Sequence, residues 1–274
     1  MQIKNTVVLV TGGAHGIGRA LCRALHMEGA RVAVADLDKD AAEKLAMEVG
    51  GLVLGMDVTR EQEIIAGIEK TEQRFGPIDI FVSNAGVAFG DGPHGAASAP
   101  NLHWQACIDV NLMAHVYAAR AMIPRMTERG GGCLVNVVSA AGLLCQIGEA
   151  AYTASKHAAV GFSESLAITH GDDGIQVCLV CPQAVATRMI GMDEDTEIQD
   201  GDRGFGGNDL DGILSAEYVA DCILGGIQDD QFLVLPHPQV TTYFQRKADD
   251  HGRWVNRMRR YRRKLVGEHD EREN

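Results

Sequence analysis

Short apolar segments alternate with helix-length amphipathic patterns along most of the chain. The apolar segments are rich in β-branched residues and leucine, and they cover 7–10, 31–35, 52–56, 78–83, 133–138, 176–181 and 232–235. The helical patterns between them cover 17–28, 39–49, 60–75, 102–129, 149–170 and 215–228. Strands that are separated by helices pair in parallel, because a parallel connection needs a crossover of a dozen residues or more. The sequence therefore predicts an α/β fold with a doubly wound parallel sheet of about seven strands in a single domain.

The composition is that of a globular protein without a membrane span. The 274 residues are 46% hydrophobic and 23% charged, which suffices to bury one large core. No apolar run approaches the ~20 residues that a bilayer requires, and the first apolar run is too short for a secretion signal. We therefore expect a cytoplasmic protein. Seven cysteines are then reduced thiols, and Cys178-x-x-Cys181, without a second pair or a histidine cluster, predicts no metal site.

Charge divides the chain into an acidic body and a basic tail. Residues 1–245 hold fifteen Lys/Arg against thirty-one Asp/Glu, whereas residues 246–264 hold nine Lys/Arg against two Asp. The acidic body argues against nucleic acid as a partner. A basic helix in the tail can dock on nucleic acid or an anionic membrane, but packing on its own acidic domain or on a neighbouring subunit is the favoured interpretation. We expect neither a nucleic-acid nor a membrane partner.

A glycine-rich acidic stretch follows the sixth predicted strand. Residues 190–212 carry eight acidic residues, six glycines and one arginine, with no helical pattern. A stretch of this composition is a loop, either a solvated insertion or a lid over a site. Its position just after the carboxyl end of a strand favours an acidic lid.

A glycine turn between the first strand and the first helix points to a bound phosphate group. Gly12, Gly16 and Gly18 stand in the sequence TGGAHGIG, where the absence of Cβ atoms lets a phosphate approach the backbone N–H groups at a helix N-terminus. Asp36 ends the second strand, eighteen residues after Gly18. A carboxylate at this position accepts the adenosine ribose hydroxyls and repels a 2′-phosphate. Since His15 is not a basic clamp, the pattern favours NAD over NADP.

Three residues predict proton transfer. Tyr152 and Lys156 are four residues apart in a helical pattern, so their side chains share one face. A tyrosine hydroxyl ordinarily has a pKa near 10, and a neighbouring ammonium lowers it. Ser139 ends the preceding strand, where its hydroxyl can point into the same crevice.

Taken together, these motifs resemble the short-chain dehydrogenase/reductase family. The motifs that carry the resemblance are TGGAHGIG, Asp36, Asp57-Val58, Asn84-Ala85-Gly86, Asn111, Ser139 and Tyr152-Thr-Ala-Ser-Lys156. The resemblance covers roughly residues 3–188, and 215–235 also fits. It implies a Rossmann-type fold with NAD lying across the carboxyl ends of the strands.

The resemblance also implies a role for each site residue. Tyr152 is the acid/base, Ser139 holds the substrate oxygen, Lys156 binds the nicotinamide ribose and lowers the pKa of Tyr152, and Asn111 supports a water that links Lys156 to solvent. Asp57 and Val58 bracket the adenine, and Thr187 reaches the carboxamide. The full set of implied cofactor-binding residues is Gly12, His15, Gly16, Ile17, Gly18, Asp36, Asp57, Val58, Asn84, Ala85, Gly86, Tyr152, Lys156, Pro182, Val185 and Thr187.

Two positions depart from the family pattern. Pro182-Gln183 stands where Pro-Gly is usual, and Ser83 replaces the first asparagine of an Asn-Asn-Ala-Gly motif. Gln183 either places an amide near the substrate or tightens the turn, and the sequence leaves this open. Neither change touches Ser139, Tyr152 or Lys156.

The function that these residues predict is NAD-dependent hydride transfer between a small, mostly apolar secondary alcohol and its ketone. The alternatives are a non-catalytic NAD-binding regulatory protein and an NADP-linked carbonyl reductase. Candidate pocket residues are Val87, Phe89, Leu143, Leu144, Gln146, Gln183, Met189, Ile190 and Met192. The acidic loop disfavours phosphorylated or CoA-linked substrates.

Assembly and domain organisation follow from helix patterns. The helices at 102–129 and 149–170 carry small and apolar residues on more than one face, and the family resemblance then implies a homotetramer. Residues 1–238 form the dinucleotide-binding catalytic domain, and residues 239–274 a basic, aromatic helical extension. The aromatic residues Phe244, Trp254 and Tyr261 are too apolar for a free tail, so we expect the extension to pack against the acidic loop and help to close the substrate pocket.

Overall fold

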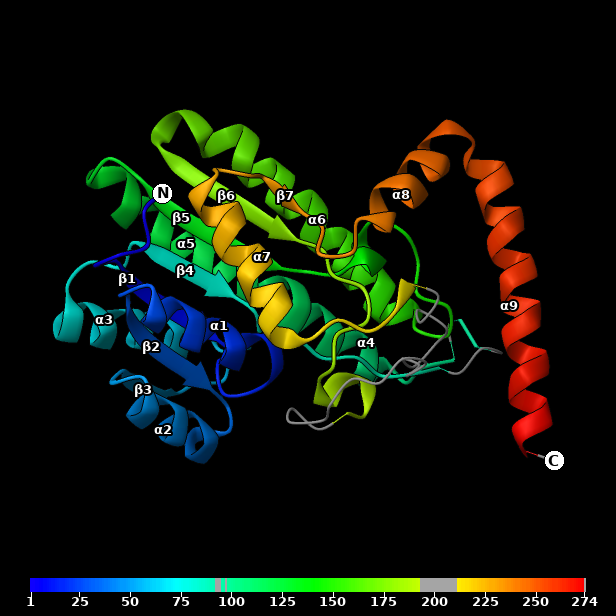
Figure 1. Ribbon diagram of the computed structural model, residues 1–274, viewed down its shortest axis with the longest axis horizontal. Helices are drawn as coiled ribbons and strands as arrows, with labels where there is room; N and C mark the ends of the chain where they lie inside the picture. Colours follow the sequence, from blue (N-terminus) through cyan, green and yellow to red (C-terminus); the bar gives the residue numbers. More distant parts are fainter. Residues whose placement is uncertain (92–94, 97, 193–210, 274) are drawn as a thin grey trace.

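Seven parallel strands form one sheet in the order β3-β2-β1-β4-β5-β6-β7 (Figure 1). The computed structural model describes residues 1–91, 95–96, 98–192 and 211–273. The strands are β1 (Val7–Thr11), β2 (Arg31–Asp36), β3 (Leu52–Gly55), β4 (Ile80–Ser83), β5 (Gly132–Val137), β6 (Ile175–Val180) and β7 (Leu233–Val234). This arrangement confirms the predicted α/β fold with a doubly wound parallel sheet.

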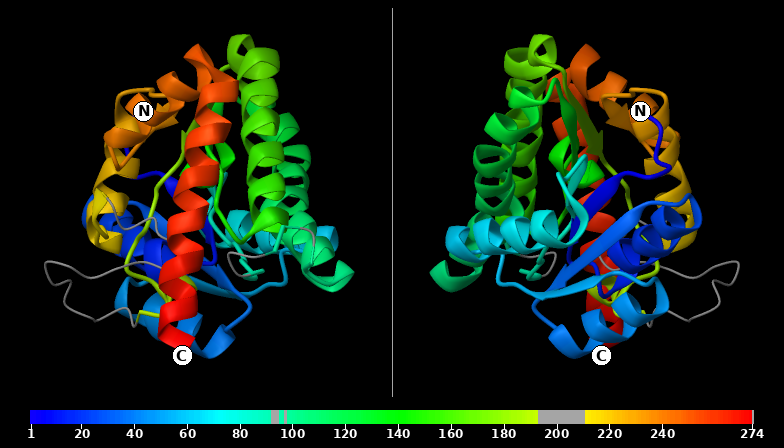
Figure 2. Two further views of the ribbon diagram at one scale, coloured as in Figure 1. Left: turned by 90° about the vertical axis from the view of Figure 1, so that its right-hand side faces the viewer. Right: turned by 90° about the vertical axis from the view of Figure 1, so that its left-hand side faces the viewer.

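Helices cover both faces of the sheet, as the two opposite views of Figure 2, taken roughly along the strands, show. One face carries α1 (Gly16–Met27), α2 (Lys39–Glu48) and α7 (Ala216–Gln228), and the other carries α3 (Glu61–Phe75), α5 (Ala114–Glu128) and α6 (Ala150–His170). Strand β1 contributes to the hydrophobic cores on both faces of the sheet, because its side chains alternate. Val8 and Val10 pack on the first face, and Val7 and Leu9 pack on the second. A strand that is buried on both sides reads as a continuous apolar run, which is why the strands were visible in the sequence.

The strand order reverses between β1 and β4. Val8, Leu9 and Val10 pair with β4 on one side and with β2 on the other, so chain segments leave β1 and β4 in opposite directions. In doubly wound sheets a crevice opens at the carboxyl ends of the strands at such a point. The fold therefore places a groove above the residues that follow β1 and β4.

The predicted helix over 102–129 contains an irregular turn. It consists of α4 (Asn101–Ile108), a π-helical turn over Asp109–Met113, and α5. A π-helical turn adds a residue to the helix and redirects the side chains that it contains, and such turns are frequent at functional sites. Asn111 lies within this turn.

The C-terminal extension forms two helices, α8 (Gln239–Asp249) and α9 (His251–Glu273). The chain breaks between them because Asp250 is extended, with φ −153° and ψ 90°, and its carboxylate accepts a 2.8 Å hydrogen bond from the Arg253 amide. Helix α9 stands outside the three layers, on the side to which the strands point (Figure 1). Most of the predicted acidic loop, residues 193–210, lies outside the described residues. Among the residues that the structure describes, no helix has both the length and the apolar character of a membrane span.

Candidate active site

Three glycines shape the turn between β1 and α1. Gly12 has φ +59° and Gly16 has φ +48°, which side-chain-bearing residues rarely adopt. A Cβ atom on Gly16 would lie 2.8 Å from Cγ2 of Thr187, and one on Gly18 would collide with the Gly12 carbonyl oxygen. The turn therefore brings backbone close to backbone and leaves the N-terminus of α1 open to an anion.

A groove of about 640 Å³ runs over this turn and along the carboxyl ends of the strands. It is lined by fifteen of the sixteen predicted cofactor residues: Gly12, His15, Gly16, Ile17, Asp36, Asp57, Val58, Asn84, Ala85, Gly86, Tyr152, Lys156, Pro182, Val185 and Thr187. Gly18 does not line it, because it packs beneath Gly12. The structure thus brings residues from five separate strand ends into one groove.

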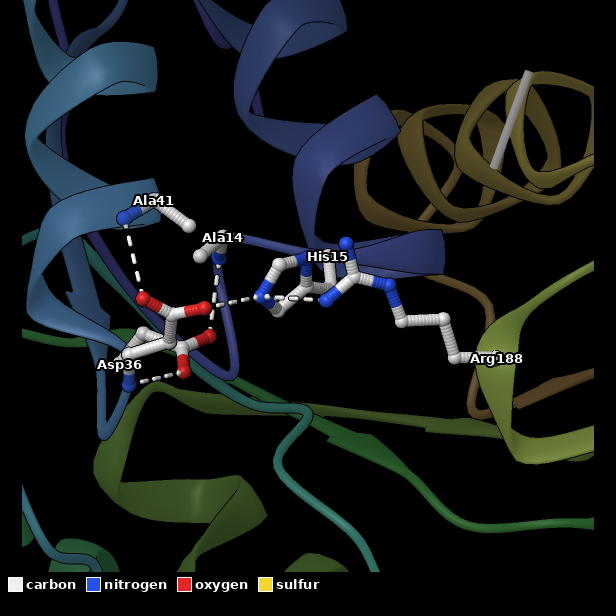
Figure 3. Close-up of polar contacts among 6 residues, drawn as sticks. Ala14, His15, Asp36, Ala41 and Arg188 are labelled. Carbon is white, nitrogen blue, oxygen red and sulfur yellow. Dashed lines mark hydrogen bonds and ion pairs between the residues drawn. The ribbon is translucent and has the colours of Figure 1, made fainter. Parts of the chain in front are cut away.

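Asp36 is held against the glycine turn. Its carboxylate accepts hydrogen bonds of 3.0 Å from the Ala14 amide and 3.0 Å from the Asp38 amide (Figure 3). Both bonds fix the carboxylate at the end of β2, beside the groove. A carboxylate oxygen accepts more than one hydrogen bond, so capacity remains for a ribose hydroxyl.

A row of hydrogen-bonded polar side chains that the sequence did not predict lies near Asp36. His15 Nε2 lies 3.0 Å from Asp38 Oδ2 and 3.2 Å from Nη1 of Arg188, so that Arg188 reaches from the segment after β6 toward the glycine turn (Figure 3). Arg188 is exposed and lines the groove. The one available signal was its position next to Thr187, a predicted cofactor contact.

Asn84 ties β4 to β1. Its side-chain amide donates to the carbonyl oxygens of Thr11 (3.0 Å) and Gly12 (2.9 Å), and its backbone amide donates to Thr11 Oγ1 (3.0 Å). Asn84 therefore fixes the shape of the glycine turn as well as lining the groove. Ser83, which departs from the family pattern, is buried inside the sheet.

Asp57 supports the loop after β3. Its carboxylate accepts hydrogen bonds from the Thr59 amide (3.0 Å) and hydroxyl (2.7 Å), and these bonds and Arg60 hold the pKa of Asp57 below its usual value. Val58 beside it is buried. Both residues follow the carboxyl end of β3 and line the groove.

Ser139, Tyr152 and Lys156 meet where β5 and α6 face each other. Ser139 follows β5, its hydroxyl oxygen accepts a 3.1 Å hydrogen bond from the Ala141 amide, and it is close enough to the Tyr152 hydroxyl to oppose the rise in the pKa of Tyr152. Lys156 is 2% exposed, with its Nζ 3.4 Å from the Val137 carbonyl oxygen and 5.6 Å from the centroid of the Tyr152 ring. The three predicted catalytic side chains are therefore neighbours in space.

Burial changes the pKa values of this group. It raises the pKa of Tyr152 to about 12, although the Ser139 hydroxyl acts in the opposite direction. It lowers the pKa of Lys156 to about 8. We expected from the sequence that Lys156 would lower the pKa of Tyr152 below 10. Instead, burial raises it, because burial penalises the phenolate, and the charge of Glu149 adds to the rise.

Asn111 fixes the loop after β4 to α6. It is fully buried, its Oδ1 accepts from the Val87 amide (2.9 Å), and its Nδ2 donates to the Val87 carbonyl oxygen (2.9 Å) and to Ser155 Oγ (3.0 Å). Asn111 does not line the groove, but its Oδ1 and Lys156 Nζ both border Gly86, whose added Cβ would lie 3.4 Å and 3.6 Å from them.

A second cavity of about 360 Å³ adjoins the groove at Ser139 and Tyr152. Of the predicted pocket residues, Leu144, Gln146, Gln183, Met189 and Ile190 line it, whereas Val87 and Phe89 line the groove and Leu143 is packed in the core. Gln183 borders both cavities, and its backbone amide donates to Nδ1 of His237 (3.1 Å).

The sequence did not identify which part of the C-terminal extension lines this second cavity, nor a buried acid in its wall. The contributions from α8 and α9 are Tyr243, Arg246, Trp254, Arg257, Met258 and Tyr261. Glu149, just before α6, also lines the cavity. Among the described residues no cluster of His, Cys, Asp and Glu forms a metal site.

Comparison with known proteins assigns the family. A family model described as short chain dehydrogenase matches residues 6–197, more than half of the chain. The chain belongs to the short-chain dehydrogenase family. This confirms the resemblance carried by the motifs, and it makes the protein an oxidoreductase of this type.

Several relatives act on alcohols according to their names. The chain is 36% identical to 2-(S)-hydroxypropyl-CoM dehydrogenase 3 of Xanthobacter autotrophicus, over 72% of this chain and 80% of the relative. It is 35% identical to D-threitol dehydrogenase of Mycolicibacterium smegmatis, over 69% and 73% of the two chains. It is 31% identical to meso-2,3-butanediol dehydrogenase of Serratia marcescens, over 69% and 75%.

A solved structure has the same fold. A short-chain dehydrogenase/reductase from Burkholderia phymatum, crystallised in complex with NAD, superposes with a TM-score of 0.80 at 24% identity. The match covers 91% of this chain and 95% of the other. At this identity the likeness bears on the fold alone.

Proposed function

We propose that the protein is an NAD-dependent dehydrogenase that interconverts a small secondary alcohol and its ketone, with Tyr152 as the acid/base. One observation carries the proposal: the hydroxyl-bearing side chains of Ser139 and Tyr152 line both the groove and the adjoining cavity. A substrate oxygen that enters from the cavity therefore meets both hydroxyls at the border of the groove. Alcohol dehydrogenases among the relatives support the same chemistry.

The groove fits a dinucleotide. The glycine turn leaves no room for a Cβ at Gly16 or Gly18, which suits a pyrophosphate at the N-terminus of α1. The Asp36 carboxylate can accept hydrogen bonds from ribose hydroxyls, and Lys156 lines the same groove. When bound, the nicotinamide accepts or returns a hydride at the substrate carbon.

NAD is the preferred cofactor in this proposal, because the Asp36 carboxylate would repel a 2′-phosphate. An NADP-linked carbonyl reductase is the second candidate, since the Arg188 guanidinium reaches the same end of the groove. The ratio of activities with the two cofactors separates these candidates.

The chain's own residues carry the proton. In alcohol oxidation the substrate hydroxyl gives its proton to the Tyr152 phenolate, and in ketone reduction the Tyr152 hydroxyl donates it back. Ser139 holds the substrate oxygen through its hydroxyl. The Lys156 ammonium, 5.6 Å from the ring centroid, favours the phenolate electrostatically. Asn111 positions this group by holding the Val87 backbone and Ser155 in place.

The test is a panel of secondary alcohols assayed with NAD and with NADP by the absorbance of the reduced cofactor. Tyr152→Phe keeps the ring and removes the proton donor, so it should lower kcat by about 10²–10⁴-fold and leave NAD affinity nearly unchanged. Residual activity within about tenfold of the wild type would refute the acid/base role. Tight NAD binding without turnover on any alcohol would instead favour the non-catalytic alternative.

We further propose a cytoplasmic homotetramer. All seven cysteines are free, which suits a reducing compartment. The outer face of α6 is exposed at Ala158, Gly161 and Ile168, and Ile168 is 85% exposed. A large apolar side chain on a face of small residues suits close packing against a second copy.

A further inference from the structure

Glu149 is a buried carboxyl without a partner in the wall of the cavity beside Tyr152. It is 8% exposed, and within the described part of the chain its side chain makes no hydrogen bond or ion pair. It stands at the N-cap position of α6, yet its side chain does not cap the helix. Because Glu149 lines the cavity and its carboxyl oxygens have no partner there among the described residues, a molecule that enters the cavity can hydrogen-bond to them.

A second carboxyl group reinforces this need. Asp91 donates a 2.5 Å hydrogen bond from its backbone amide to the Gly148 carbonyl oxygen, which brings it next to Glu149. Its Oδ2 is buried and has no partner among the described residues. Burial, with the Asp91 charge, raises the pKa of Glu149 to about 7. Near neutral pH this carboxyl is therefore present in both its protonated and its ionised forms, and can donate or accept a hydrogen bond.

Glu149 lies three residues before Tyr152 at the start of one helix. The backbone of Glu149 is not helical, with φ −145° and ψ 65°, but its charge raises the pKa of Tyr152, and both residues line the same cavity as Ser139. A substrate whose reacting oxygen lies at Ser139 and Tyr152 therefore presents its adjacent carbon toward Glu149. The rest of the cavity wall includes the apolar residues Ala141, Leu144 and Met189 and, from the C-terminal part of the chain, the charged residues Asp211, Arg246 and Arg257.

We propose that Glu149 binds a second hydroxyl of the substrate, so that the enzyme prefers vicinal diols or polyols to mono-alcohols. A hydroxyl both donates and accepts, and thus matches either form of the carboxyl. This inference rests on the proposed function, since it names the substrate class of the same site. It assigns Glu149 to specificity and leaves proton transfer to Tyr152.

The experiment compares 2,3-butanediol and D-threitol with 2-butanol in the wild type, Glu149→Gln and Glu149→Leu. The wild type should have a higher kcat/KM for at least one polyol than for 2-butanol. Glu149→Leu should raise KM for that polyol about tenfold or more, with the KM for 2-butanol and the NAD dissociation constant within about twofold. Glu149→Gln should retain most of the polyol preference, because an amide also donates and accepts. Glu164→Leu, at an exposed position of the same helix, is the matched control.

Four outcomes would overturn the inference. A wild type that prefers 2-butanol contradicts it directly. Equal losses on the polyol and on 2-butanol in Glu149→Leu would assign Glu149 a structural role. A preference for 3-amino-2-butanol over the diol, lost in Glu149→Gln, would mean that the carboxylate binds a cation. If the wild type oxidises none of these alcohols, the proposed function fails and this inference fails with it.

Discussion

Lys247 anchors the C-terminal extension to the loop that carries the active site. Its Nζ donates to the carbonyl oxygens of Leu143 (2.7 Å) and Leu144 (3.2 Å), lies 3.2 Å from Nε2 of His157, and is 5.0 Å from the centroid of the Trp254 ring. The contacts join α8, α9, α6 and the segment after Ser139. We predict that Lys247→Met releases the extension from the substrate pocket, because methionine keeps most of the apolar stem but loses the ammonium.

The size of the effect follows from these contacts. Hydrogen bonds from a charged donor contribute ~1.5–3 kcal/mol, and a cation–π contact at an exposed site ~0.5–1 kcal/mol. Lys247 is only half-buried, so we take about 2 kcal/mol for the whole set, which is roughly a 30-fold shift in the docked population. KM for the alcohol should rise by up to this factor. KM for NAD should stay unchanged, because no described residue of α8 or α9 lines the groove.

The assay is steady-state kinetics with each substrate varied in turn, together with the tryptophan emission spectrum. Trp254 is half-buried and lies under Lys247, so its emission should shift to the red when the extension is released. Gln245→Met is the control, since Gln245 is exposed on the same helix and bonds only to Asp249. If Lys247→Met and Gln245→Met have the same KM for the alcohol, the extension does not contribute to the pocket. Truncation after Pro238 should give a larger rise than either variant.

Three further results are expected. Asp36→Asn removes the negative charge that repels a 2′-phosphate, an interaction of about 1–2 kcal/mol across some 4 Å. The ratio of kcat/KM with NADP to kcat/KM with NAD should therefore rise by about tenfold. An unchanged ratio would mean that Asp36 does not lie at the ribose. His157 donates through Nδ1 to the Thr153 carbonyl oxygen and accepts from Lys247, which requires its neutral form, and burial holds its pKa below 6.5. Protonation of His157 places a second positive charge beside the Lys247 ammonium and weakens the contacts that dock the extension. KM for the alcohol should therefore rise as the pH falls below 6.5 in the wild type but not in Lys247→Met. Ile168→Asp puts a charge on the exposed face of α6 and should reduce the mass found by light scattering; a wild type that is already monomeric would refute the tetramer.

The sequence predicted the sheet because each strand is buried on both sides. The run over residues 7–10 leaves no polar position, and such a run is typical of a parallel sheet covered by helices on both faces. The glycine turn was equally predictable from the sequence, since the positive φ angles at Gly12 and Gly16 allow few residues other than glycine. Fifteen of the predicted cofactor residues then meet in one groove because parallel strands end at the same edge of the sheet.

Other features depended on tertiary contacts that a linear pattern does not contain. Helical periodicity over 102–129 gave no sign of the π-helical turn that turns Asn111 toward Val87 and Ser155. The pKa of Tyr152 follows from how deeply the ring is buried, which the four-residue spacing to Lys156 does not reveal. The contact of Arg188 with the glycine turn and the effect of Asp91 on the pKa of Glu149 both join segments that are distant in the chain, so neither could be predicted from the local sequence.

The border between the two cavities explains why the catalytic group is buried so deeply. The residues that line both cavities are Ala88, Ser139, Tyr152, Gln183, Met189 and Ile190, and among them only Ser139 and Tyr152 carry hydroxyl groups. In the proposed function, a substrate and a dinucleotide that enter from opposite sides meet at the two hydroxyls that the described residues provide on that border. Burial at this border penalises the phenolate form and raises the pKa of Tyr152 to about 12. In the proposed mechanism, a tyrosine with so high a pKa keeps its proton until a substrate oxygen, hydrogen-bonded to Ser139, lies close enough to exchange it.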